Sequence, residues 1–168
     1  MQKLSTVNIK HLLQNVLLLL LISISALAQV PAKIIPGFTF FKLDKTEFTN
    51  KNLVQGKQLF FVFFDITCDH CQHAVSEINK HFQELKKTAI YLISLDNQQK
   101  MNQFLDKYGQ NLKNKNNVTL LQDLNNEFIK KFGPRKYPSL FLYSAKRELI
   151  LYDDDEKKLT LFLKQIKK

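Results

Sequence analysis

Residues 59–71 read Leu-Phe-Phe-Val-Phe-Phe-Asp-Ile-Thr-Cys-Asp-His-Cys and contain both cysteines of the 168-residue chain, Cys68 and Cys71. The run 59–64 is entirely apolar, which is typical of a β-strand buried on both faces of a sheet. From Cys71 to Leu85, apolar residues recur at steps of three and four, which predicts a helix with one buried face. The cysteine pair is therefore expected at a junction between a buried strand and a helix.

Strand and helix patterns continue on both sides of this junction. Apolar alternation and apolar runs predict further extended segments at 38–43, 89–95, 118–121, 139–144 and 148–152. Residues 46–57 are predicted to be a polar connecting segment. Helical spacing predicts three more helices, near 101–112, 124–132 and 159–166. The order predicts an α/β fold, with a central mixed sheet covered by helices and an extra N-terminal strand.

The N-terminus has the composition of an export signal. Lys3 and Lys10 supply positive charge, residues 16–24 are almost wholly apolar, and Ala26-Leu27-Ala28 offers the small residues that a signal peptidase requires. A retained membrane anchor is the alternative, but the apolar stretch 16–28 has 13 residues where a bilayer needs about 20. We therefore expect cleavage after residue 28.

This division predicts a signal peptide at 1–28, a linker at 29–37 and one domain at 38–168. Removing the signal lowers the formal charge from +10 to +8. The positive residues are scattered through the segments without forming one dense stripe, so a nucleic-acid partner is not expected. Membrane contact is expected only through a retained signal segment or through weak attraction of the basic surface to anionic lipid. The favoured location is the bacterial periplasm, which the protein would reach by secretion.

The spacing of the cysteines favours reversible redox chemistry over a structural disulfide. A bridge between Cys68 and Cys71 closes a very short loop, which restrains little of the unfolded chain. At the exposed start of a helix, free N–H groups and the helix dipole favour the thiolate of Cys68. Cys71 lies one turn further on and faces the core. We therefore assign Cys68 as the nucleophile and Cys71 as the resolving thiol.

The two residues between the cysteines act on Cys68 in opposite directions. A protonated His70 favours the thiolate, whereas the carboxylate of Asp69 disfavours it. A charge at a helix start contributes about 0.3 to 1 kcal/mol, which is less than one pKa unit, so the direction of electron flow stays open. As the simpler alternative, Asp69 caps the helix and His70 is merely exposed.

A second motif, Tyr137-Pro138-Ser139, stands directly before the apolar run 140–143. With the cysteine motif, it resembles the thioredoxin superfamily, in particular its secreted TlpA-like and ResA-like branch, over the chain from Pro36 onward. The resemblance implies a thioredoxin-like three-layer α/β/α sandwich. It also implies that Pro138 follows a cis peptide bond beside the cysteines and that the neighbouring backbone holds a substrate segment next to Cys68.

The chain departs from this family pattern at several positions. Thr67 replaces the aromatic residue that commonly precedes the first cysteine, and bulky Tyr137 precedes the proline. Val62 stands where thioredoxins carry a buried acid, so proton transfer to or from Cys71 would use Asp65 or water.

The resemblance implies a thiol-disulfide oxidoreductase that exchanges the Cys68–Cys71 dithiol or disulfide with exported proteins, with the reductant direction favoured. No cofactor beyond this redox-active disulfide is expected. The implied partners are exported thiol or disulfide proteins and an upstream electron donor or acceptor. The alternatives are a disulfide oxidase or isomerase of the same fold and a non-catalytic thioredoxin-fold module, with or without a bound metal.

Two further site types fit the sequence less well. His70 and His73 share a helix face while Cys71 points elsewhere, so a metal site is not expected. A peroxidase of the peroxiredoxin type would carry threonine three residues before its cysteine and proline further upstream. The chain has Asp65 and Phe61 at these positions, so peroxidase activity is not expected.

Overall fold

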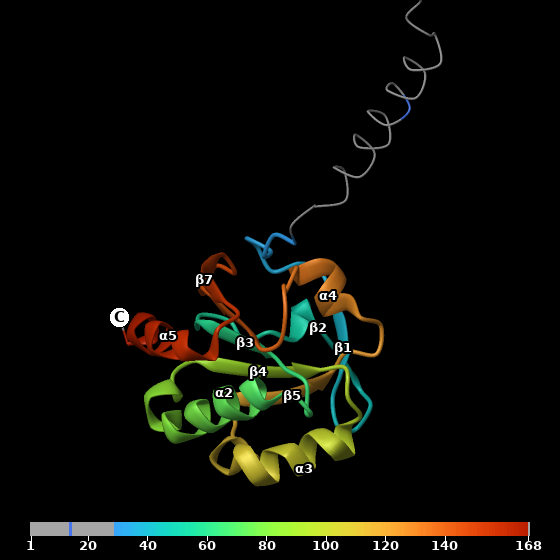
Figure 1. Ribbon diagram of the computed structural model, residues 1–168. Helices are drawn as coiled ribbons and strands as arrows, with labels where there is room; N and C mark the ends of the chain where they lie inside the picture. Colours follow the sequence, from blue (N-terminus) through green and yellow to red (C-terminus); the bar gives the residue numbers. More distant parts are fainter. Residues whose placement is uncertain (1–13, 15–28, 168) are drawn as a thin grey trace, which may run out of the picture.

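A computed structural model describes residue 14 and residues 29–167 (Figure 1). The expected signal peptide lies outside the described residues, apart from residue 14. The strands are β1 (Thr39–Phe41), β2 (Glu47–Thr49), β3 (Leu59–Phe63), β4 (Ala89–Ser94), β5 (Val118–Gln122), β6 (Ser139–Tyr143) and β7 (Leu149–Asp153). The helices are α2 (Asp69–Lys80), α3 (Gln98–Tyr108), α4 (Glu127–Phe132) and α5 (Leu159–Ile166). Single 3-10 turns are η2 (Asn50–Asn52), η3 (Phe82–Leu85), η4 (Gln110–Leu112) and η5 (Glu156–Lys158).

The described strands form one mixed sheet in the order β2-β1-β5-β4-β3-β6-β7. The three central strands β5, β4 and β3 are parallel, and the other pairings are antiparallel. The predicted α/β fold with a central mixed sheet is confirmed. Because the central strands are parallel, the segments that follow β3, β4 and β5 all emerge at the same end of the sheet, here called the carboxyl end.

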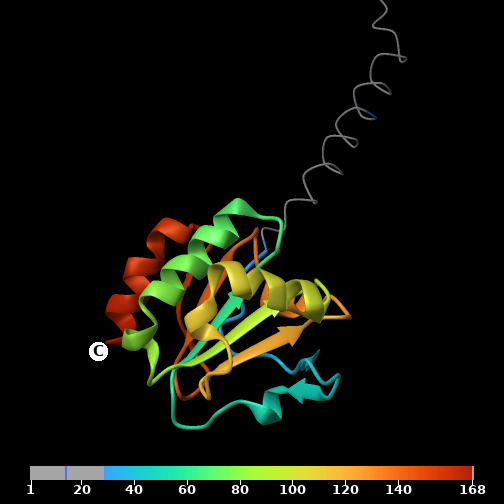
Figure 2. The ribbon, with the colours of Figure 1, turned by 90° about the horizontal axis from the view of Figure 1, so that it is seen from below.

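Helices cover both faces of the sheet and make three layers. α2, α3 and α5 pack on one face, as Figure 2 shows, and α4 packs on the other. Strand β3 serves both cores, because Phe60 and Val62 point to one face while Phe61 and Phe63 point to the other. All four side chains are at most 2% exposed, which confirms a strand buried on both sides.

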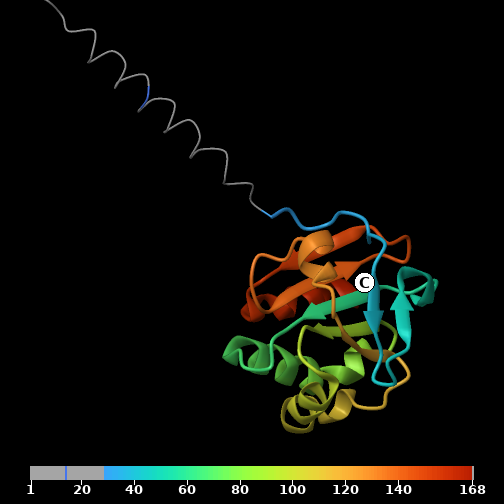
Figure 3. The same ribbon diagram turned by 90° about the vertical axis from the view of Figure 1, so that its right-hand side faces the viewer.

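Two local predictions differ from the structure. Strand β2 lies within the segment predicted as polar connection, and Figure 3 shows it beside β1. It escaped the sequence pattern because it has three residues, of which only Phe48 is buried. The helix after the cysteines ends at Lys80, and the apolar residues beyond it belong to η3.

The segment predicted as a linker is bonded to the domain. The backbone N–H of Ala32 donates to Phe132 at 2.9 Å, and the Tyr143 hydroxyl donates to the Ala32 carbonyl at 2.9 Å. Further along, Ile34 forms a β-bridge with Glu148. Residues 32–35 are therefore part of the folded domain and not a free connection.

Candidate active site

Cys68 is the N-cap of α2, one position before the helix start that the sequence predicted for it. Its backbone is extended (φ −82°, ψ 116°), and its side chain is half-buried. The backbone N–H of Cys71 donates to Cys68 Sγ at 3.3 Å and to the Cys68 carbonyl at 3.0 Å. The sulfur therefore takes the place of the usual hydroxyl or carboxylate cap, and Asp69 is the first helical residue instead of the cap.

Cys71 lies one turn into the helix, fully buried beside Val75 and Ile78. Burial raises the pKa of its thiol far above the ordinary value, and a hydrogen bond with Cys68 raises it further. The backbone N–H of Asp65 opposes this shift in part. Both cysteines are free thiols in the structure, so the pair is described in its reduced form, with Cys71 protonated at neutral pH.

The loop that leads from β3 into the helix is fixed by two carboxylates. Asp65 accepts hydrogen bonds from the N–H and the hydroxyl of Thr67, at 2.7 and 2.6 Å. Asp96, from the loop after β4, accepts from the Ile66 N–H at 3.2 Å and from Ser94 Oγ at 3.0 Å. The loop before Cys68 is thereby held against the end of β4.

Acids follow each of the three central strands and gather near Tyr137. Burial raises the pKa of Tyr137 to about 12, and the charges of Asp65, Asp96 and Asp123 contribute to this rise. The tyrosine ring packs 4.7 Å from the ring of Phe63. The Tyr137 hydroxyl is therefore neutral in the physiological range. The sequence singled out Asp65 alone, although a carboxylate directly after each buried strand was a readable signal.

The Tyr137–Pro138 peptide bond is cis, and Pro138 directly precedes β6. Ser139 pairs with Phe63 across the sheet, which brings Pro138 to the carboxyl end of β3, where the chain turns into the cysteine motif. Ser139 Oγ donates to the Lys136 carbonyl at 2.7 Å and holds this turn closed. The register thus brings together two motifs that lie far apart in the sequence.

His70 is exposed, but it is not free. Its Nδ1 lies 3.0 Å from Glu156 Oε1, which joins the start of α2 to η5. Burial raises the pKa of Glu156, but the hydrogen bond from His70, the backbone N–H of Glu156 and the charge of His70 together lower it, so the net pKa is lowered. Both residues, with Tyr137, line a hollow of about 220 Å³. Sequence reasoning missed Glu156, because it lies 86 residues from its partner.

We expect the His70–Glu156 contact to stabilise the fold modestly. A double-mutant cycle with His70→Ala and Glu156→Gln, followed by urea unfolding, should give a coupling of about 0.2 to 1 kcal/mol, as for exposed ion pairs. Because the folded-state pKa of Glu156 is lowered, this coupling is present above its unfolded pKa and is lost as pH falls through the folded value. A coupling that persists once Glu156 is protonated would contradict the assignment.

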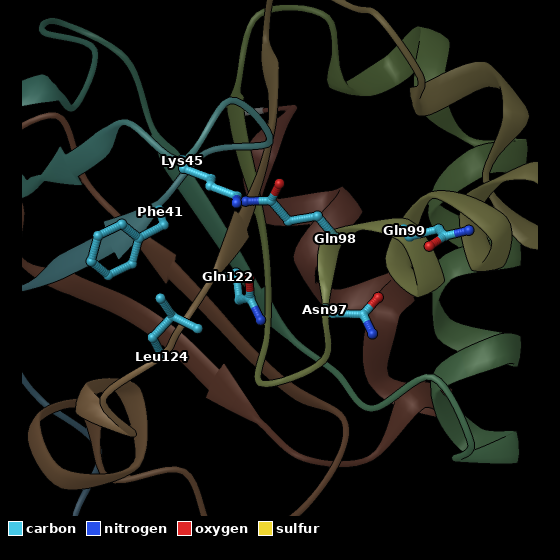
Figure 4. A pocket seen from close by; sticks show the side chains of 7 residues that line it. All are labelled: Phe41, Lys45, Asn97, Gln98, Gln99, Gln122 and Leu124. Carbon is cyan, nitrogen blue, oxygen red and sulfur yellow. The ribbon is translucent and has the colours of Figure 1, made fainter.

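A larger pocket lies further along the same end of the sheet (Figure 4). It has a volume of about 540 Å³ and is lined by Phe41, Lys45, Asn97, Gln98, Gln99, Gln122 and Leu124. Lys45 and Gln98 point toward one another, with Phe41 and Leu124 on one side. The loop after β4, which lines one side of this pocket, is joined to the loop before the cysteines by the hydrogen bond from the Ile66 N–H to Asp96.

Within residues 29–167, no three His, Cys, Asp or Glu side chains are grouped in a way that would hold a metal ion. In the same described part of the chain, every helix is too short or too polar to cross a bilayer.

Comparison with known proteins agrees with this arrangement. A family model described as the AhpC/TSA family matches residues 31–157. None of the curated proteins matches the chain in sequence. A putative thioredoxin from Neisseria meningitidis superposes with a TM-score of 0.63 at 22% identity, covering 80% of this chain and 90% of that one. A thiol-disulfide oxidoreductase from Bacteroides fragilis gives 0.63 at 20%, covering 80% and 99%. A thiol peroxidase from Chromobacterium violaceum gives 0.62 at 14%, covering 81% and 86%.

Proposed function

Because the chain belongs to the AhpC/TSA family and is a thiol-disulfide enzyme of the thioredoxin superfamily, we propose that it reduces disulfides in exported proteins through Cys68 and Cys71. The observation that carries this proposal is the contrast between the two thiols. Cys68 is half-buried at the helix start, whereas Cys71 is fully buried and hydrogen-bonded to it. One thiol is therefore placed to meet a substrate and the other to act only on its neighbour.

In the proposed reaction, the Cys68 thiolate attacks one sulfur of a substrate disulfide. A bond forms between Cys68 and that sulfur, and the other substrate sulfur leaves as a thiolate that takes up a proton. Cys71 then loses its proton and attacks Cys68 Sγ, which releases the second substrate thiol and leaves the Cys68–Cys71 disulfide. Two protein thiols are oxidised as one substrate disulfide is reduced, so an upstream dithiol donor must restore the pair.

The proton on Cys71 needs an acceptor during the second step. Val62 is a fully buried apolar residue, so the position of the thioredoxin acid cannot supply one. Asp65 is the carboxylate whose charge and backbone N–H act on Cys71, although two hydrogen bonds from Thr67 engage its side chain. We assign proton acceptance to Asp65, directly or through a water molecule.

Substrate would lie along the turn around Pro138. This turn stands at the carboxyl end of β3, and Tyr137 borders the same hollow as His70. A substrate segment paired with this backbone would carry its disulfide to Cys68. Tyr137 and Pro138 are assigned to substrate support, while Asp69 is a first-turn acid that the helix dipole stabilises.

The pairing of His70 supports the reductant direction. Strong stabilisation of the first thiolate makes a dithiol pair oxidising, because it favours the reduced form. The positive charge that His70 would offer to Cys68 is offset by Glu156 at 3.0 Å. Cys68 therefore lacks an uncompensated histidine charge within its own motif.

Equilibration of the purified protein in glutathione buffers tests both activity and direction. The redox state of the Cys68–Cys71 pair is measured by thiol alkylation and mass spectrometry. Its reduction potential should be about −270 mV, in the range of reductants. A value near about −120 mV would assign the oxidase alternative instead. A pair that never cycles between dithiol and disulfide would exclude the reaction. Hydrogen peroxide consumption, measured in parallel, distinguishes a peroxidase.

The expected location follows from the N-terminal composition. We propose that residues 1–28 direct export and that the domain works in the periplasm on exported thiol or disulfide proteins. Cell fractionation with N-terminal sequencing of the recovered protein tests this, since a mature chain beginning at Gln29 is the expected result.

A further inference from the structure

Lysines that are scattered in the sequence meet at one end of the sheet in the structure. Lys57 lies just before β3, Lys86 and Lys87 lie just before β4, and Lys115 lies just before β5. These strands are parallel and in register, so their starts lie side by side. All four lysines are exposed.

The β6–β7 turn brings further positive side chains to the same end. Tyr143, the last residue of β6, pairs with Leu59, the first residue of β3, so the turn that carries Lys146 and Arg147 emerges there. Lys33 joins them, because its carbonyl accepts from the Leu149 N–H at 2.7 Å. The turn also carries one exposed acid, Glu148. We call this surface the basic end: Lys33, Lys57, Lys86, Lys87, Lys115, Lys146 and Arg147.

The opposite end of the sheet carries acids and the cysteines. Asp65, Asp96 and Asp123 follow the central strands, and Cys68 follows β3. Five-residue strands separate the two ends by about 17 Å. The basic end therefore lies opposite the cysteine pair, whereas the lysines of the carboxyl end, such as Lys136 and Lys157, lie among acids.

A polar pocket opens at the basic end. It has a volume of about 370 Å³ and is lined by Phe82, Gln83, Lys86, Asn111, Asn114, Lys115, Asn116 and Asn117. One wall is fixed, because Asn117 Nδ2 donates to the carbonyls of Leu85 and Thr88 at 3.1 and 2.8 Å. Two ammonium groups and several carboxamide N–H groups thus surround one hollow. This donor set suits a phosphate group, which accepts several hydrogen bonds and carries negative charge.

We propose that the basic end docks on an anionic phospholipid membrane, with a headgroup phosphate in the Lys86–Lys115 pocket and Cys68 facing away from the lipid. The acceptor is a membrane surface, because the proposed export would bring the domain to the outer face of a membrane, whose phosphates lie in one plane. Each lysine near such a surface strengthens binding about fivefold. This docking does not depend on the exchange reaction.

Co-sedimentation of the full chain with vesicles tests the docking. Phosphatidylcholine vesicles are compared with vesicles that contain phosphatidylglycerol, because an apolar N-terminal segment binds both kinds and only charge distinguishes them. The chain should prefer the anionic vesicles, and high salt should remove this preference. Equal binding to both kinds would overturn the proposal.

Two triple variants with the same net charge localise the effect. Lys86→Gln/Lys87→Gln/Lys115→Gln should weaken the preference about hundredfold. The matched control Lys100→Gln/Lys136→Gln/Lys157→Gln removes three lysines near the carboxyl end and should change it by less than about threefold. An equal loss in both variants would show attraction by net charge alone and would contradict a defined face.

The pocket and the orientation have readouts of their own. Asn114→Asp places a negative charge beside the two lysines and should weaken anionic binding while every lysine is kept. Glycerol phosphate at millimolar concentration should not release the bound chain, and release would assign the pocket to a free phosphate.

A water-soluble maleimide should modify Cys68 equally fast in bound and free protein. Protection of Cys68 by vesicles would overturn the orientation.

Discussion

Replacing Cys68 with serine is expected to lower the reduction of insulin disulfides to the rate seen without protein. Serine keeps the size of the side chain and can still cap α2, but at neutral pH its hydroxyl does not form the anion that attacks a disulfide. Turbidity from precipitating insulin chains, with dithiothreitol as the donor, measures the effect. Circular dichroism should match that of the unchanged chain, and retained activity in Cys68→Ser would refute the assigned nucleophile.

Cys71→Ser should give the complementary result. The first attack by Cys68 still occurs, but no thiol follows to release the substrate, so a mixed disulfide accumulates. It should appear on non-reducing gels as a band that dithiothreitol removes, and Cys68→Ser/Cys71→Ser should lack it. If Cys71→Ser turned over at the normal rate, the resolving role would pass to an external thiol. Mass spectrometry of the trapped species from cells would identify the partner proteins.

Phe61→Ala is expected to destabilise the domain by about 3 to 5 kcal/mol. Phe61 is fully buried in the central strand, with ring centroids 4.9 Å from Tyr91 and 5.5 Å from Phe132. Truncation leaves a cavity between β3 and α4 that backbone pairing prevents from closing. Since domains are stable by about 5 to 15 kcal/mol, urea unfolding should show the loss of a large share of the total.

Two further variants show how large the loss of stability in Phe61→Ala is. Phe61→Leu keeps most of the volume and should be destabilised by less than about 1.5 kcal/mol. Leu161→Ala removes an apolar side chain that is 44% exposed on α5, and its change should stay within about 0.5 kcal/mol. A loss in Phe61→Ala no larger than in Leu161→Ala would mean that the aromatic cluster does not hold the sheet together.

The sequence predicted the fold correctly wherever burial imposes a regular spacing of apolar residues. The run 59–64 allows few structures other than a central strand, and the apolar spacing after Cys71 correctly predicted a helix there, although α2 begins at Asp69. Strand β2 was not readable, because its pairing with β1 fixes three residues of which one is buried. The attachment of residues 32–35 was not readable either, since backbone hydrogen bonds leave no mark on side-chain periodicity.

The candidate site divides in the same way. Cys68 and Cys71 were recognisable by type and spacing, and Pro138 through the resemblance to the thioredoxin superfamily. The β3–β6 register brings Pro138 to the end of the strand that precedes the cysteines. The pairing of His70 with Glu156 depends on how η5 packs against α2, which no local pattern encodes. The position of the basic end likewise depends on strand order, so lysines that looked dispersed proved to be neighbours.

The attachment of residues 32–35 also dictates the order of folding. Ala32 and Tyr143 are 111 residues apart, so their hydrogen bond closes a loop that spans most of the domain. The hydrogen bond between Lys33 and Leu149 requires β7 as well. A chain that leaves a ribosome or a translocation channel N-terminus first cannot complete this contact until nearly all of it has emerged. Residues 32–35 therefore attach to the domain only after β6 and the start of β7 have been made.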